Sequence, residues 1–134
     1  MMLFTDASVN PQTGIGYGSF VAVDKIEESL NDIAKRVRTR RFDSTSSTRL
    51  ELETVLWALN EIRPAQVDAY TDSQNIESLL KRRARIEKNN YCSKSERPYK
   101  HRHLYKEFFK WKDRINFRVI KVSRHCPGIM KTKR

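Results

Sequence analysis

Three acidic side chains stand at positions that can bring them together. Asp6 lies in the apolar run that opens the chain, Glu51 lies near the start of a stretch with helical periodicity, and Asp72 follows a short β-prone stretch. Carboxylates that converge on one point repel one another unless a divalent cation lies between them. Ligation by oxygen alone suits Mg²⁺ or Mn²⁺, hard ions that also bind phosphate. The predicted chemistry is therefore that of a metal ion near a phosphate group.

Hydrophobic patterning predicts the elements that must position these acids. In chain order they are strands at 2–8, 15–23 and 33–42, a helix that follows the cap residues 44–47 and ends before Pro64, a strand at 67–71, helices at 74–83 and 104–112, and a strand at 117–122. The predicted order is β-β-β-α-β-α-α-β. The first two strands form a hairpin, because turn-forming residues separate them.

The order of these elements predicts where the acids meet. A strand, a crossover helix and a further strand in one sheet pair in parallel with a right-handed connection. The strand at 67–71 can therefore lie beside the first strand, so that Asp6 and Asp72 share one edge of the sheet. Glu51 lies in the first turn of the crossover helix, which places it at the same edge.

Two of the three acids also have a structural interpretation. Glu51 lies three residues after Thr48, the spacing of a capping box, and Asp72 precedes a helix that it can cap. Asp6 is harder to explain structurally, since an acid inside an apolar strand is costly without a partner. The order of the motifs favours a shared functional role over three separate structural ones.

Charge is concentrated in two segments of a chain whose formal net charge is +11. Residues 81–103 contain nine Lys or Arg and two Glu, and residues 118–134 contain six Lys or Arg and no acid. Basic segments on a nearly neutral body are typical of a surface that binds phosphates. The alternative is a solvated basic loop and tail.

Composition limits the remaining possibilities. A chain of 134 residues with 38% apolar residues is expected to form a single domain over residues 1–134 with a real core. No apolar run approaches the roughly 20 residues that a membrane-spanning helix needs. Cys92 and Cys126 belong to no CxxC pair and are expected to be free thiols of a reducing, cytoplasmic compartment.

Three motifs together resemble type 1 ribonuclease H, the metal-dependent endonuclease that cuts the RNA strand of an RNA/DNA hybrid. They are Thr5-Asp6-Ala7-Ser8, Arg49-Leu50-Glu51-Leu52 and Thr71-Asp72-Ser73-Gln74, and they occur in the family's order and at its typical spacings. The resemblance covers the chain from Leu3 to His125. It implies an α/β, ribonuclease H-like fold with a five-stranded mixed sheet and helices on both faces.

The resemblance also implies roles for particular residues. Asp6, Glu51 and Asp72 match three of the family's four metal-binding carboxylates, and His125 matches a mobile-loop histidine implicated in product release. The positions that match contacts to the hybrid are Ser8, Ser46, Thr48 and Gln74, with Ser46 near a DNA phosphate. Residues 81–103 resemble a basic insertion that grips the DNA strand, with Lys94, Lys100 and Arg102 as candidate contacts.

The activity that the resemblance implies is hydrolysis with two Mg²⁺ or Mn²⁺ ions, leaving a 5′-phosphate and a 3′-hydroxyl. The partner is then an RNA/DNA hybrid, with no membrane partner, and the chain is expected to be a monomer. The family's fourth carboxylate typically follows the loop histidine by about ten residues or more, and no Asp or Glu follows Asp113 in this sequence. The 134-residue form is therefore expected to bind hybrid and to cleave it slowly or not at all in Mg²⁺. Two alternatives stay open: a module that binds hybrid or duplex without cutting it, and a resolvase-like or transposase-like nuclease of the same fold.

Overall fold

The computed structural model describes residues 1–24, 29–93 and 95–122. Its strands are β1 (Met2–Asn10), β2 (Ile15–Val23), β3 (Arg38–Phe42), β4 (Gln66–Thr71) and β5 (Asn116–Lys121). Its helices are α1 (Leu30–Lys35), α2 (Ser47–Ile62), α3 (Gln74–Lys81), α4 (Arg83–Lys88) and α5 (Arg102–Arg114). The strands form one mixed sheet in the order β3-β2-β1-β4-β5. The α/β fold with a five-stranded mixed sheet is therefore confirmed.

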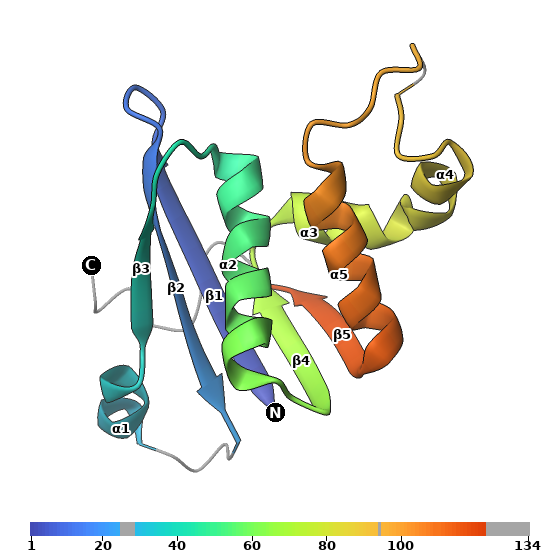
Figure 1. Ribbon diagram of the computed structural model, residues 1–134. Helices are drawn as coiled ribbons and strands as arrows, with labels where there is room; N and C mark the ends of the chain where they lie inside the picture. The colour runs from blue at the N-terminus through green and yellow to red at the C-terminus, as the bar shows by residue number, and fades with distance from the viewer. Residues whose placement is uncertain (25–28, 94, 123–134) are drawn as a thin grey trace.

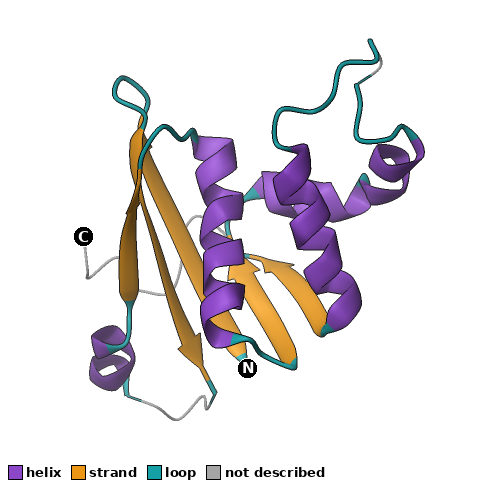
Figure 2. Ribbon diagram, viewed as in Figure 1, coloured by secondary structure: helices purple, strands orange, loops and turns teal. Residues whose placement is uncertain are grey.

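Helices cover both faces of this sheet. In Figure 1, α2 and α5 lie in front of the strands, and Figure 2 shows the same two layers as helix over strand. The main core lies between these layers and contains Leu59 of α2, Leu79 of α3 and Phe108 of α5. On the opposite face, Ile33 of α1 packs in a smaller cluster with Val21 and Val23. Burial of these apolar side chains holds the helices to the sheet.

The start of α2 lies very close to β2. A Cβ atom added to Gly18 would lie 2.2 Å from Oγ1 of Thr54, and one added to Gly16 would lie 2.5 Å from Cδ2 of Leu50. A side chain at Gly18 would therefore push α2 away from the sheet, whereas one at Gly16 would require the Leu50 side chain to move. The absence of a side chain at Gly18 lets the helix approach, and this approach brings Glu51 to the place where β1 and β4 separate.

The predicted parallel pairing of the first and fourth strands is confirmed. Phe4 of β1 pairs with Tyr70 of β4, and the two rings stack with their centroids 5.0 Å apart. β5 pairs in parallel with the other side of β4, while β1 and β2 form the predicted antiparallel hairpin. The carboxyl ends of β1 and β4 therefore point to the same edge of the sheet.

Part of the predicted third strand was wrong. Residues 33–35 belong to α1, and the strand covers only Arg38–Phe42. Ser29 caps the helix, because its hydroxyl accepts a hydrogen bond from the N–H of Asp32 at 3.2 Å. The spacing of four residues between Ile33 and Val37 suits a helix as well as a strand, so apolar spacing alone could not decide between them.

The basic insertion at 81–103 contains a helix that patterning did not predict. α4 is a short helix, anchored by the buried side chain of Ile86 and by Arg83, which pairs with Asp113 of α5. With α1 and α4 added, the order becomes β-β-α-β-α-β-α-α-α-β. No helix in the described ranges is long and apolar enough to cross a membrane.

Candidate active site

The candidate site lies where β1 and β4 separate. Their pairing ends at Phe4 and Tyr70, and each strand presents an acid two residues further on, Asp6 and Asp72. One pocket at this edge is lined by both acids and by Glu51. Its other lining residues are Thr5, Ala7, Thr54 and Thr71. The three acids therefore line one pocket, at the place that the order of the elements predicts.

Glu51 is held in place by the segment that follows β4. The hydroxyl of Ser73 donates a hydrogen bond of 2.5 Å to Oε2 of Glu51, and the amide of Asn75 lies 3.3 Å from the same oxygen. Ser73 is buried, and its oxygen also accepts from the N–H of Ile76 at 3.2 Å. The same hydroxyl therefore caps α3 and orients a carboxylate of α2.

Neither structural interpretation of Glu51 and Asp72 holds. The N-cap of α2 is Ser46, whose oxygen accepts from the N–H of Arg49 at 3.4 Å, so Thr48 and Glu51 do not form a capping box. The N-cap of α3 is Ser73 and not Asp72, and Asp72 is exposed. Both acids are therefore at this edge without a capping role to explain them.

Asp6 points toward the same pocket from a half-buried position. Its Oδ1 accepts a hydrogen bond of 3.0 Å from the N–H of Ala7. This contact orients the carboxylate just beyond Phe4, where the pairing of β1 with β4 ends.

The carboxylates at this site are ligands that suit a hard cation, but in the described residues they do not form a group that could hold one. Asp6, Glu51 and Asp72 offer only carboxylate oxygens, the ligands that Mg²⁺ and Mn²⁺ prefer. Among the described residues, no three His, Cys, Asp or Glu side chains are grouped closely enough to hold a metal ion as they stand.

The other predicted site residues lie around this pocket. Ser46 and Thr48 are exposed at the start of α2, and Gln74 is exposed as the first residue of α3. Ser8 lies further along β1, in a hollow of the hairpin that it shares with Tyr17.

Of the predicted residues in the basic insertion and the loop histidine, two lie within the described residues and two lie outside them. Lys100 and Arg102 are exposed beside the start of α5. Lys94 and His125 lie outside the described residues.

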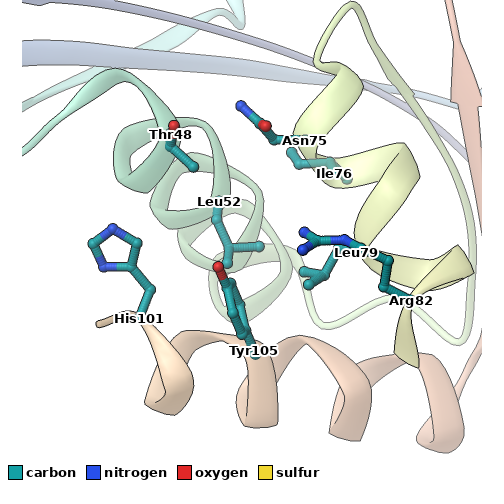
Figure 3. A pocket seen from close by; sticks show the side chains of 8 residues that line it. All are labelled: Thr48, Leu52, Asn75, Ile76, Leu79, Arg82, His101 and Tyr105. Carbon is teal, nitrogen blue, oxygen red and sulfur yellow. The ribbon is translucent and has the colours of Figure 1, made fainter. Parts of the chain in front are cut away.

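A second pocket lies next to the acidic one, between α2, α3 and α5. Its lining residues are Thr48, Leu52, Asn75, Ile76, Leu79, Arg82, His101 and Tyr105 (Figure 3). Asn75 connects the two pockets, because its amide contacts Glu51. Burial lowers the pKa of His101, and the positive charges of Arg49, Lys100 and His103 lower it further, against Glu53, which raises it.

The residues that complete these two pockets were not predicted from the sequence. Ser73 and Asn75 follow Asp72 closely, and their polar types next to a predicted helix start were a usable signal. Arg82, His101 and Tyr105 come from segments that are distant in sequence from α2, so only the tertiary fold brings them together.

The comparison with protein families gives one clear result. The family model described as RNase H matches residues 1–132 of the chain. A search of curated proteins finds no match to the sequence.

Proposed function

This chain belongs to the RNase H family, and we propose that it is a metal-dependent endonuclease that hydrolyses the RNA strand of RNA/DNA hybrids. The observation that carries this proposal is the pocket that Asp6, Glu51 and Asp72 line together where β1 and β4 separate. Glu51 and Asp72 do not cap the helices beside them, so capping does not explain why acids stand at these positions.

Divalent cations are the group that this pocket suits. Two Mg²⁺ or Mn²⁺ ions bound here would supply an activated water and charge neutralisation at the leaving oxygen. Asp6, Glu51 and Asp72 are the carboxylates that would hold these ions. Because the hydrogen bonds from Ser73 and Asn75 both end on Oε2 of Glu51, binding through Oε1 would leave them intact.

The surroundings of the pocket support a nucleic-acid substrate. Ser46, Thr48 and Gln74 present polar side chains at the adjoining starts of α2 and α3. Hydrogen bonds from such groups to 2′-hydroxyls distinguish RNA from DNA. Lys100 and Arg102 add exposed positive charge beside them, which favours contact with phosphates.

Cleavage of labelled nucleic acids tests the proposal. We expect the protein, expressed from its complete reading frame, to cut the RNA strand of a hybrid in Mg²⁺ or Mn²⁺ and to leave RNA duplex, DNA duplex and four-way junctions intact. Asp6→Asn should abolish most cleavage while retaining the fold. Asp32→Asn, which changes an exposed acid of α1, is the matched control and should retain full activity. Near-full activity of Asp6→Asn would overturn the proposal.

A module that binds hybrid without cutting it is the second candidate. It is favoured by the open arrangement of the acids, since no metal-holding group of three is formed among the described residues. It predicts hybrid binding that is the same with and without divalent cations, together with no cleavage in either metal. Cleavage of junctions in preference to hybrid would instead indicate a resolvase-like nuclease.

A further inference from the structure

The strand β3 forms one edge of the sheet and carries a high density of positive charge. It pairs with β2 on one side, and Figure 1 shows it as the outermost strand at the left of the sheet. Its five residues, Arg38–Phe42, include three arginines, and the first four are exposed. No other strand among the described residues pairs with it, so its outward N–H and C=O groups are open to a further strand.

Two of these arginines are held on one face of the sheet by aromatic rings. Arg40 pairs with Gly18 of β2, which lies against α2, and Arg38 is on the same face because side chains alternate along a strand. The Cζ atoms of Arg38 and Arg40 lie 5.6 Å and 5.9 Å from the ring centroid of Trp57 in α2. Arg40 also lies 5.0 Å from the centroid of Phe42. These cation–π contacts restrict where the two positive charges can lie.

Nearby acids leave part of this charge available. Arg38 pairs with Glu61 of α2 at 3.3 Å, and Arg41, on the opposite face of β3, pairs with Asp43 at 2.9 Å. Both ion pairs are exposed, and such pairs are weak in water. In the described part of the chain, Arg40 contacts aromatic rings and forms no ion pair. An incoming carboxylate can therefore compete for Arg38 and can reach Arg40 without displacing an acid.

The charge of β3 discriminates among the strands that could pair with it. Opposite charges that face each other across two strands stabilise the pairing, and like charges destabilise it. A second copy of this chain would place its own basic β3 against this one, so the arginines disfavour pairing between copies. A nucleic acid could neutralise the arginines but offers no row of amide groups to the edge of the strand. An extended acidic peptide can satisfy both the arginines and the open backbone groups.

We propose that β3 binds an extended acidic segment of a partner protein, which adds a strand to the sheet and places acids at alternate positions opposite Arg38 and Arg40. Side chains two residues apart in a strand lie on the same face, so acids at positions i and i+2 match the spacing of the two arginines. Backbone hydrogen bonds then supply affinity, and the arginines supply specificity. Neither arginine lines the acidic pocket, so the proposal is independent of the proposed nuclease activity.

Two synthetic peptides of identical composition test the proposal. In one, Glu and Thr alternate over about ten residues, a length that strands in proteins reach, so every Glu lies on one face. In the other, the same residues form a block of Glu followed by a block of Thr. Fluorescence anisotropy with the full chain then separates the effect of spacing from the effect of net charge. We expect the alternating peptide to bind about tenfold more tightly, because its acids can all face one side of the strand. Equal affinity for the two peptides would overturn the proposal.

Adjacent arginines on opposite faces of β3 supply a matched pair of variants. Arg40→Gln removes a charge from the face of α2, and Arg41→Gln removes one from the other face. Both positions are exposed, so both variants should keep the fold. Arg40→Gln should weaken binding of the alternating peptide severalfold, and Arg41→Gln should retain most of it. An equal loss in the two variants would indicate general attraction to a basic surface and would contradict the proposal.

Amide hydrogen exchange tests whether the strand edge itself is used. Exchange over residues 38–42 should slow when the alternating peptide binds, because the added strand accepts hydrogen bonds from outward N–H groups. Binding without slower exchange would refute strand addition. Protection that rises with protein concentration in the absence of peptide would identify a second copy as the occupant instead.

Hybrid binding distinguishes a peptide site from a nucleic-acid surface. We expect Arg40→Gln to bind RNA/DNA hybrid as tightly as the unmodified protein, with EDTA present to prevent cleavage. A loss of hybrid affinity as large as the loss of peptide affinity would assign these arginines to nucleic acid and overturn the proposal. A protein that fails to cleave hybrid can still bind the peptide, so failure of this proposal and failure of the proposed function are distinguishable.

Discussion

Ser73 and Glu51 are joined by a hydrogen bond of 2.5 Å between the serine hydroxyl and Oε2 of the carboxylate. The bond connects the first residue after Asp72 to the first turns of α2. This short segment therefore contains one candidate ligand, Asp72, and orients a second, Glu51, through the hydroxyl of Ser73. Because Ser73 also caps α3, the orientation of Glu51 is coupled to the start of that helix.

Replacing Ser73 with Ala is expected to reduce both stability and metal affinity. The loss of the N-cap should cost about 1 kcal/mol of unfolding free energy, and the freed Glu51 carboxylate should bind Mn²⁺ more weakly. Urea unfolding and calorimetric titration with Mn²⁺ measure the two effects. Ser78→Ala is the matched control, since its hydroxyl donates within α3, to the carbonyl of Asn75. Unchanged Mn²⁺ affinity in Ser73→Ala would show that this serine does not orient a metal ligand.

Gly18→Ala is expected to disturb the site through Thr54, which lines the same pocket as Glu51. The added Cβ would lie 2.2 Å from Oγ1 of Thr54, which is buried and donates to the carbonyl of Leu50 at 2.7 Å. Overpacking of this kind typically costs about 1–3 kcal/mol, and moving α2 would also move Glu51. Thermal unfolding and Mn²⁺ titration should both register the change. A variant with normal stability would show that α2 does not need this close approach.

Much of this arrangement could be predicted from the sequence, and the reasons are physical. Asp6 lies within β1 and Asp72 directly follows β4, and the handedness of the crossover between these parallel strands leaves few ways to place the two acids. The contacts of Ser73 and Asn75 to Glu51 could not be predicted, since they depend on side-chain directions between two helices. The second pocket was missed for the same reason, because it combines three helices that are far apart in the chain.

The errors at element boundaries have a different origin. α1 is short and has one buried residue, Ile33, so it carries too few apolar positions to show a helical period. α4 likewise buries only Ile86 and lies in a strongly basic segment. In both helices the deciding interactions are tertiary, as in the pairing of Arg83 with Asp113.

Glu51→Gln and Asp72→Asn are each expected to remove the stabilisation that a bound cation provides. A ligand that binds only the folded state raises the unfolding temperature, and the effect grows with its concentration relative to its Kd. Mn²⁺ should therefore raise the melting temperature of the unmodified protein and have little effect on either variant. Without metal, both variants should be at least as stable as the unmodified protein, because repulsion between the acids is relieved. An equal response to Mn²⁺ in all three proteins would exclude these residues as ligands.

The cations of the basic insertion are expected to contribute to hybrid binding regardless of the nucleotide sequence. Replacing Lys94, Lys100 and Arg102 together with Ala should weaken binding similarly for all hybrids. The slope of log affinity against log salt should become shallower by about one unit for each phosphate that the variant no longer neutralises. Lys35→Ala, at an exposed cation of α1, is the control and should leave the slope unchanged. An unchanged slope in the triple variant would show that these cations do not contact phosphates and that the segment is a solvated loop.

The pairing of Arg83 with Asp113 predicts a stability difference that depends on pH. Both NH groups of the Arg83 guanidinium donate to the Asp113 carboxylate at 2.6 Å, joining α4 to α5, and this holds the pKa of Asp113 below its ordinary value. A carboxyl whose pKa is lower in the folded state than in the unfolded chain contributes stability above its unfolded pKa of about 4. That contribution is lost as the pH falls through the folded value, where the acid becomes protonated.

Asp113→Asn should therefore be less stable than the unmodified protein at neutral pH, and the difference should shrink as the pH falls below about 4. Because Asp113 is well exposed, added salt should also reduce the difference. Urea unfolding over a range of pH and salt concentrations measures it, with Asp32→Asn as a control for loss of an exposed acid elsewhere. A difference that stays constant from neutral to acidic pH would mean that the Asn side chain, and not the loss of the ion pair, causes it.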